Sequence, residues 1–161
     1  MSEGRNIWCP HVTVATVVAD KEGRFLMVEE VIRGELRYNQ PAGHLEPDEA
    51  LADAARRETL EETGWDVEIE YFLGVHQWWS PVHHDHVVRF GFSARTTAHH
   101  PERELDTGIR RALWMPRDEI AALGKKLRSP LVLASIDDWL AGQRLSLGTI
   151  KSMLPVAATA P

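Results

Sequence analysis

The sequence predicts a fold that combines strands and helices, of the α/β or α+β class, around a mixed β-sheet that is at least partly antiparallel. Three observations favour this class. Several runs rich in β-branched residues alternate in polarity, one helical segment interrupts them early, and further helical segments follow near the end of the chain. We expect a single domain over 1–161, with its core in about 8–145 and a frayed tail at 154–161.

Strand-like runs occupy much of the first two thirds of the chain. The run 11–19 alternates in polarity, KEG at 21–23 is typical of a turn, and 24–32 follows as a partner strand, which predicts a hairpin. The runs 66–79 and 86–95 flank a polar stretch and predict two more strands. A further strand is expected at IRRALWM, residues 109–115.

Helix signals mark three segments, one of which is PRDEIAAL at 116–123, with proline at a plausible first helical position. Pro47 at the start, Asp48 and Glu49 in the first turn and Gly64 past the end predict a helix over 47–63. Near the end of the chain, Ser129 is expected to open a last helix that Gly142 closes.

Composition narrows the possible partners. A net charge of −6 argues against a nucleic-acid polymer as partner, but allows a small phosphorylated ligand at a local cationic site. No window approaches the ~18–20 apolar residues of a membrane helix, so we expect no membrane partner. The start lacks the apolar core of a signal peptide and Cys9 is the only cysteine, which favours a cytoplasmic location. A monomer and a homodimer are equally compatible with the sequence.

Three glutamates near the end of the first helix are the main functional signal. Glu58, Glu61 and Glu62 share one helical face, and Leu51, Ala54 and Ala55 lie on the same side as Glu58. A solvated acidic face would lie opposite the apolar residues, so these carboxylates are expected to face protein or a cleft. Like charges near the negative end of a helix are unfavourable, and a divalent cation would reverse the penalty. Mg²⁺, with Mn²⁺ as second choice, suits an all-carboxylate site better than zinc.

The spacing around these glutamates resembles the Nudix box, G-x5-E-x7-R-E-U-x-E-E-x-G-U, where U is an aliphatic residue. The seven matching positions are Gly43, Glu49, Arg57, Glu58, Glu61, Glu62 and Gly64. Thr59 and Trp65 depart from the pattern, at positions that we expect to pack on the hydrophobic side of the helix. The resemblance implies a Nudix-type α/β/α sandwich around a mixed β-sheet.

The resemblance also implies roles for these residues. Glu58 and Glu62 would be the principal metal ligands, Glu61 a further ligand or the base that activates water, and the Gly43 carbonyl another ligand. The catalytic set would be Glu61, Glu58 and Arg57, with Glu49 and Gly64 bracing the box. Since the identity of the base is open, the acids of the later loop are also candidates: Glu102, Glu104 and Asp106.

Segments beyond the box resemble the NudJ subgroup of bacterial Nudix phosphatases, among them NQPAGHLE, HQWWSP and VRFGF. This implies a Mg²⁺-dependent phosphohydrolase that releases orthophosphate from nucleoside tri- and diphosphates and from the thiamine precursor hydroxymethylpyrimidine pyrophosphate. Pro81 lies sixteen residues after Trp65, a spacing associated with ADP-ribose pyrophosphatases, which is the enzymatic alternative. An alternative of another class is a non-catalytic Nudix domain that senses a nucleotide.

Substrate-binding candidates come from the strand-like runs. Arg37 and Arg89 could meet substrate phosphate or form structural ion pairs, and Trp78 could stack on a base. The histidines of the loop 83–86 are interpreted mainly as solvated. The basic residues of 125–128 are interpreted as helix C-terminal charge.

Overall fold

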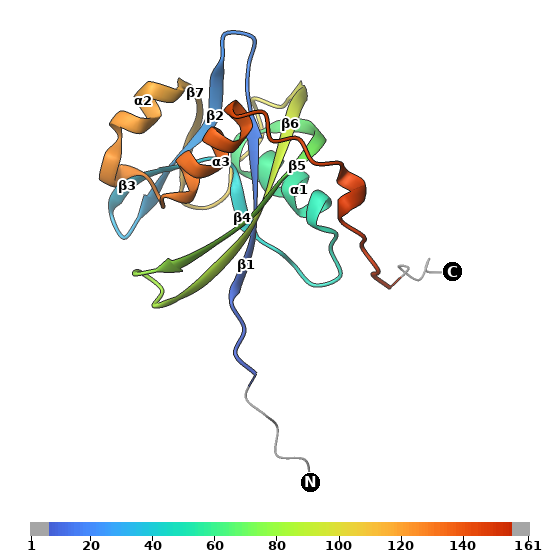
Figure 1. Cartoon of the computed structure of the whole chain (residues 1–161). Coiled ribbons are helices and arrows are strands. Elements are labelled where there is room, and N and C mark those ends of the chain that lie inside the picture. The colour runs from blue at the N-terminus through green and yellow to red at the C-terminus, as the bar shows by residue number, and fades with distance from the viewer. Residues whose placement is uncertain (1–6, 156–161) are drawn as a thin grey trace.

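The structure is a computed structural model of the chain and describes residues 7–155 (Figure 1). The strands are β1 (His11–Val18), β2 (Arg24–Ile32), β3 (Glu35–Asn39), β4 (Ala42–His44), β5 (Trp65–Ser80), β6 (Asp85–His99) and β7 (Ile109–Pro116). The helices are α1 (Leu51–Thr63), α2 (Arg117–Ala122) and α3 (Leu131–Leu140), with short 3-10 turns η1 (Gly124–Lys126) and η2 (Leu147–Thr149). The tail expected at 154–161 lies mostly outside the described residues.

The strands form two sheets. One is mixed and four-stranded, with the order β4-β1-β6-β5, in which β1 and β6 run parallel and the other pairs antiparallel. The other is three-stranded and antiparallel, with the order β3-β2-β7. The predicted fold class and its mixed sheet are therefore confirmed, whereas a second sheet was not expected.

Helices cover both faces of the central strand β1, which runs between α1 and α3 (Figure 1). Val14 belongs to the apolar cluster that contains Ala54 and Ala55 of α1. Val17 belongs to a second cluster with Ile136 of α3. Because residues separated by an odd number of positions on a strand point to opposite faces, the two helices pack on opposite sides of the sheet. This is the α/β/α layering that the resemblance implied.

The hairpin predicted for 11–19 and 24–32 is wrong, although both strands exist. Apart from one isolated bridge between Ala19 and Phe25, β1 and β2 belong to different sheets. The two edges of β1 are taken by β4 and β6, and those of β2 by β3 and β7. The turn at 21–23 thus passes the chain from one sheet to the other. The paired strands at 66–79 and 86–95 are confirmed as the long hairpin β5–β6, and 109–115 as β7.

Two of the predicted helix starts need correction. α1 begins at Leu51, not at residue 47, because Asp48 has a φ of 60° and a left-handed residue cannot continue a right-handed helix. Glu49 instead turns back toward the helix, where it binds Arg57. α3 begins at Leu131 with Pro130 as its N-cap, so Ser129 does not open it.

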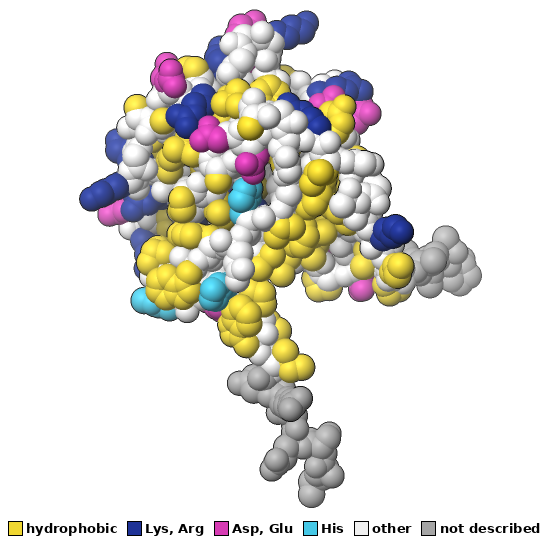
Figure 2. Space-filling view, viewed as in Figure 1, with side chains coloured by type: hydrophobic (Ala, Val, Ile, Leu, Met, Phe, Trp, Pro, Cys, Tyr) yellow, Lys and Arg dark blue, Asp and Glu magenta, His cyan; other side chains and the backbone are white. Residues whose placement is uncertain are grey.

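The exposed surface combines charged and apolar regions. Where the β5–β6 hairpin tip lies beside the segment that leads into β1, apolar side chains gather on the face shown in Figure 2. Trp8, Trp79 and Val82 are exposed there, and the Trp8 indole donates a hydrogen bond to Asp85. Within residues 7–155, every helix is too short or too polar to cross a membrane.

The end of α1 generates a stability prediction. Gly64 has a φ of 70°, its N–H donates to the Leu60 carbonyl, and a β-carbon there would lie 2.9 Å from the His100 carbonyl oxygen. We expect Gly64→Ala to lower the free energy of unfolding by about 2–4 kcal/mol, from left-handed strain and from this overlap. Gly23, with a φ of 77° and open space around it, is the matched control, and Gly23→Ala should cost only the strain, about 1–2 kcal/mol. Equal losses in urea unfolding would contradict the overlap.

Candidate active site

The second half of α1 turns carboxylates toward the protein. Glu58 and Glu62 are only 8 % and 9 % exposed, on the side of the helix that also buries Ala54 and Ala55. Thr59, which departs from the box pattern, is fully buried on this side and hydrogen-bonds the Ala55 carbonyl. The prediction that the acidic stripe continues the packing stripe is therefore confirmed for Glu58 and Glu62, whereas Glu61 is only partly buried.

Strand β4 lies directly against these carboxylates. A β-carbon at Gly43 would overlap the Glu58 carboxylate, so only glycine allows this approach of the backbone. The neighbouring Ala42 N–H donates a hydrogen bond of 2.8 Å to Glu62 Oε2. A short strand thus brings backbone groups to two of the predicted metal ligands.

Arg57 hydrogen-bonds three glutamates of the box. Its Nε and Nη2 donate to the two oxygens of Glu49 at 2.7 and 2.9 Å, a bidentate pair. Its Nη1 donates to Glu58 at 2.8 Å and to Glu61 at 3.1 Å, and Nη2 also reaches the His44 carbonyl at 3.1 Å. This hydrogen bonding from Arg57 lowers the pKa of Glu49. Glu49 and Arg57 therefore hold the loop before α1 and orient its carboxylates.

Burial disfavours the charged forms of Glu58 and Glu62, and the nearby positive charge does not compensate fully. Burial raises the pKa of Glu58, and Arg57 opposes this only in part. Burial also raises the pKa of Glu62 well above its ordinary value, despite the Ala42 N–H, and the charges of Glu58, Glu30 and Asp106 raise it further. A nearby cation would favour the charged forms.

A loop after β6 brings Asp106 beside Glu58 and Glu61, in a cluster that does not include Glu62. Oxygens of Glu58, Glu61 and Asp106 lie within 4.8 Å of one another. The Asp106 N–H donates to the Glu61 carbonyl at 3.0 Å, which fixes the loop beside α1. Of the three loop acids considered from the sequence, only Asp106 joins this cluster. Carboxylate oxygens at this spacing, partly buried, fit a hard divalent cation.

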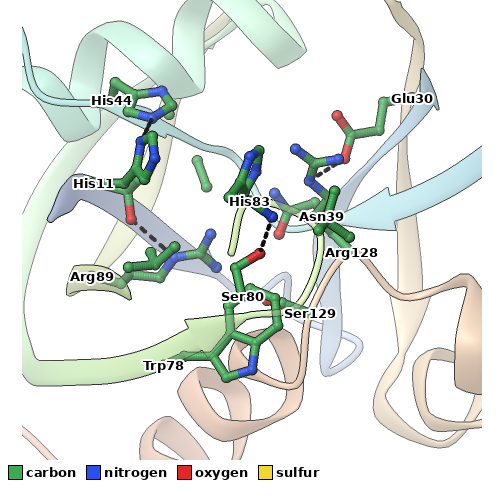
Figure 3. Close-up of a pocket in the computed structure, with 15 residues that line it drawn as sticks. His11, Glu30, Asn39, His44, Trp78, Ser80, His83, Arg89, Arg128 and Ser129 are labelled. Atoms are coloured by element: carbon green, nitrogen blue, oxygen red, sulfur yellow. Dashed lines mark hydrogen bonds and ion pairs between the residues drawn. The ribbon is translucent and has the colours of Figure 1, made fainter. Parts of the chain in front are cut away.

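A cavity of about 170 Å³, lined by both polar and apolar side chains, lies beside β4 (Figure 3). Ala42 and Gly43 belong to its lining and also contact Glu62 and Glu58, so the cavity and the carboxylate site share these two residues of β4. Of the predicted substrate-binding residues, Trp78 and Arg89 line it. Arg37 is not part of the lining, and its guanidinium pairs with Glu35.

Arg89 is the main cation of the cavity. It is 6 % exposed, its Nε donates a long hydrogen bond of 3.4 Å to Thr13 Oγ1, and its Nη1 has no hydrogen-bond partner among residues 7–155. Burial lowers the pKa of Arg89 to about 10, while the charges of Glu62 and Glu30 oppose this shift. The guanidinium is charged at neutral pH, and one of its donors is free for an anionic group.

Sequence reasoning missed most of the remaining lining. Arg128 had been interpreted as helix C-terminal charge, but it lines the cavity and lies 3.8 Å from Glu30. Ser129 had been interpreted as a helix opener, but its side chain also lines the cavity. Asn39 comes from the end of β3. These residues converge from separate segments, so no local spacing could have indicated them.

The fold and the site together define a hydrolase with a carboxylate centre suited to divalent metal. The NUDIX domain model matches residues 10–135, and the chain belongs to the Nudix family. The comparisons with individual proteins agree. Phosphatase NudJ of Escherichia coli (strain K12) is 45 % identical over 141 residues, which cover 88 % of this chain and 90 % of that protein.

Solved structures also show similarity to Nudix proteins. A NUDIX hydrolase from Nitrosomonas europaea has a TM-score of 0.86 and 42 % identity, covering 89 % of this chain and 97 % of that chain. An ADP-ribose pyrophosphatase from Streptococcus suis has a TM-score of 0.64 at 15 % identity, with 86 % and 97 % covered, and shows the shared fold alone. The protein is a Nudix hydrolase with phosphohydrolase or pyrophosphatase activity, and members of this family generally use a divalent metal.

The contact between Gly43 and Glu58 generates a second prediction. Gly43→Ala must displace the carboxylate, so we expect Mn²⁺ affinity measured by calorimetry to fall at least about tenfold. Gly91→Ala is the matched control, because its β-carbon would meet Leu73 at an ordinary 3.6 Å. Unchanged Mn²⁺ binding in Gly43→Ala, with a normal thermal melt, would contradict the assignment of this contact to the metal site.

Proposed function

We propose that the protein is a Mg²⁺-dependent phosphohydrolase of small phosphorylated molecules that releases orthophosphate. The candidate substrates are nucleoside tri- and diphosphates and hydroxymethylpyrimidine pyrophosphate. One observation carries the proposal: the buried carboxylates of α1 lie against β4 at Gly43, and this residue also borders a cavity that contains the free donor of Arg89. The similarity to phosphatase NudJ supports the release of orthophosphate.

The metal would be held by Glu58, Glu62 and Glu61 and by the carbonyl of Gly43, with Mn²⁺ as a substitute for Mg²⁺. Asp106 lies close enough to Glu58 and Glu61 to bind the same ion, whereas Glu62 is outside that cluster. When bound, such a cation neutralises phosphate oxygens and lowers the pKa of a coordinated water.

Other residues of the chain would orient the carboxylates and accept the proton of the attacking water. Arg57 orients Glu58 and Glu61 through one nitrogen, Nη1, which donates to both carboxylates. Glu61 is more exposed than Glu58, so it is the better placed of the two to accept a proton from attacking water. Asp106 is the second candidate base, because it lies beside Glu61 on a different segment.

Substrate binding is assigned to Arg89 and Trp78, with Arg37 as a more distant candidate. The buried guanidinium of Arg89 can donate to a phosphate oxygen without a competing carboxylate hydrogen bond. The Trp78 indole can cover the face of a ring in the cavity. Arg37 would first have to leave Glu35.

The two alternatives have less support. Hydrolysis of ADP-ribose rests on the position of Pro81, which lies in the turn after β5. A nucleotide sensor without activity is disfavoured because all the box acids are present and because the chain is 45 % identical to a phosphatase. We further propose a single catalytic domain, which the family match over 10–135 supports, and a cytoplasmic location, for which the single cysteine argues.

The products of hydrolysis test the proposed function directly. Nucleoside tri- and diphosphates, hydroxymethylpyrimidine pyrophosphate and ADP-ribose would be incubated with Mg²⁺, with and without added inorganic pyrophosphatase. We expect orthophosphate without the added enzyme, because cleavage is proposed to release a single phosphate. AMP and ribose phosphate from ADP-ribose, without orthophosphate from the others, would favour the alternative.

Glu62→Gln tests two roles of the Glu62 carboxyl, as a metal ligand through kcat and as a buried acid through protein stability. We expect kcat to fall at least about a hundredfold, because the variant removes a charged ligand. Since the native state holds a proton that the unfolded chain has lost, the stability contributed by this carboxyl falls as pH rises above its unfolded pKa.

Metal-free Glu62→Gln should therefore unfold at higher urea than the metal-free wild type near neutral pH. The difference should disappear at acidic pH, where the carboxyl is protonated in both states. Unchanged activity in this variant would refute the assigned metal role.

A further inference from the structure

The cavity beside β4 is positively charged, although the chain as a whole is negative. Its lining contains two arginines, Arg89 and Arg128, and one acid, Glu30, which gives a formal charge of +1 with the histidines neutral. The whole chain carries −6. Burial raises the pKa of Glu30, which favours the neutral form of this acid. The charge of the cavity therefore favours an anionic ligand.

The two arginines lie on opposite sides of the cavity (Figure 3). Arg89 comes from β6 and is buried, and its Nη1 has no hydrogen-bond partner among residues 7–155. Arg128 follows η1, and its Nε lies 3.8 Å from Glu30 Oε1, an ion pair at longer than hydrogen-bond distance. Burial lowers the pKa of Arg89, and the positive charge of Arg128 lowers it further. An anion between the two guanidinium groups would offset their repulsion.

The segment that leads into α3 adds donors on the side of Arg128. Ser129 is 7 % exposed and lines the cavity, and its hydroxyl has no partner in the described part of the chain. α3 begins two residues later, at Leu131, and its N-terminus has no side-chain cap. Such an N-terminus presents backbone N–H groups and the positive end of the helix dipole, and both favour an anion.

A phosphate group matches this set of donors. All its terminal oxygens accept hydrogen bonds, and they point in different directions, so donors on opposite walls can bind the same group. A guanidinium binds phosphate through two N–H groups, and a serine hydroxyl donates to a further oxygen. The free Nη1 of Arg89 and the free hydroxyl of Ser129 are therefore both explained by one ligand.

We propose that Arg89, Arg128 and Ser129 form an oxyanion subsite that binds a phosphate group of the substrate without a metal ion. This inference rests on the proposed function and deepens it. Ala42 and Gly43 line the cavity and also contact the carboxylates of α1, so the subsite and the carboxylates lie on either side of β4. One phosphate is held at the metal and its neighbour in the subsite. The protein thereby selects substrates with at least two linked phosphates.

Calorimetry with inorganic orthophosphate in the presence of EDTA isolates the subsite from the metal. We expect the wild type to bind orthophosphate under these conditions. Arg128→Ala should weaken this binding at least about tenfold, because it removes a charged donor. Ser129→Ala should weaken it about threefold to tenfold, since it removes a neutral donor. The inference is overturned if the metal-free wild type binds no orthophosphate, or if Arg128→Ala binds it equally well.

Arg117→Ala is the matched control. The Arg117 side chain is 35 % exposed, against 32 % for Arg128, and it pairs with Asp137 away from the cavity. This variant should keep the orthophosphate affinity of the wild type. An equal loss in both arginine variants would overturn the inference, because any positive charge would then serve. Should a thermal melt show that Arg128→Ala is unfolded, Arg128→Lys replaces it and should bind more weakly than the wild type, since lysine lacks the planar fork.

Kinetics identify the source of the phosphate group. If the group belongs to the substrate, Arg128→Ala should raise KM for ATP at least about tenfold and leave kcat nearly unchanged. Weaker orthophosphate binding with an unchanged KM would overturn the inference, because the ligand would then be a free anion. If the wild type hydrolyses no phosphorylated compound, the proposed function fails, and ATP binding in EDTA decides the inference separately. Equal ATP affinity of the wild type and Arg128→Ala would then overturn it.

Discussion

The contact between the β4 backbone and the carboxylates of α1 is the constraint on which the rest of the site depends. Glu58 occupies the space that a side chain at residue 43 would take, and Glu62 accepts a hydrogen bond from the neighbouring residue of β4. Because β4 pairs with β1, this contact fixes the position of α1 relative to the mixed sheet. Any shift of the helix would move all its carboxylates together.

Burying charge in this way is unfavourable, and the helix compensates in two ways. Its first half packs Ala54 and Ala55 on the core, which anchors the second half. Arg57 supplies the nearest positive charge, and Glu49 holds that arginine in a bidentate pair. Burial nevertheless keeps the pKa values of Glu58 and Glu62 raised, and at Glu58 it outweighs the arginine. A bound divalent cation is the group that the arrangement still requires.

The cavity next to this helix is built from elements that are distant in the sequence. β1 and β6 run parallel at its base, where Thr13 pairs with Arg89, while the ends of β3 and the segment before α3 close another side. In the proposed function, recognition of the substrate and its hydrolysis thus use different parts of the chain and meet at β4. Changes in the cavity can alter specificity while the carboxylates of α1 stay in place.

The sequence alone determined the fold class, the strands of the long hairpin and the inward face of α1. These features follow from local periodicity, which is set by backbone geometry within one element. The spacing of the box also indicated the carboxylate cluster, because Arg57, Glu58 and Glu61 lie on one helix.

Only the tertiary structure decided which strands pair with β1 and with β2, and that α1 starts at Leu51. It also decided the lining of the cavity, which includes Asn39, Arg128 and Ser129. Pairing depends on which strand edges remain free, and the lining depends on which segments converge in space. Neither the strand pairing nor the cavity lining can be predicted from the spacing of neighbouring residues.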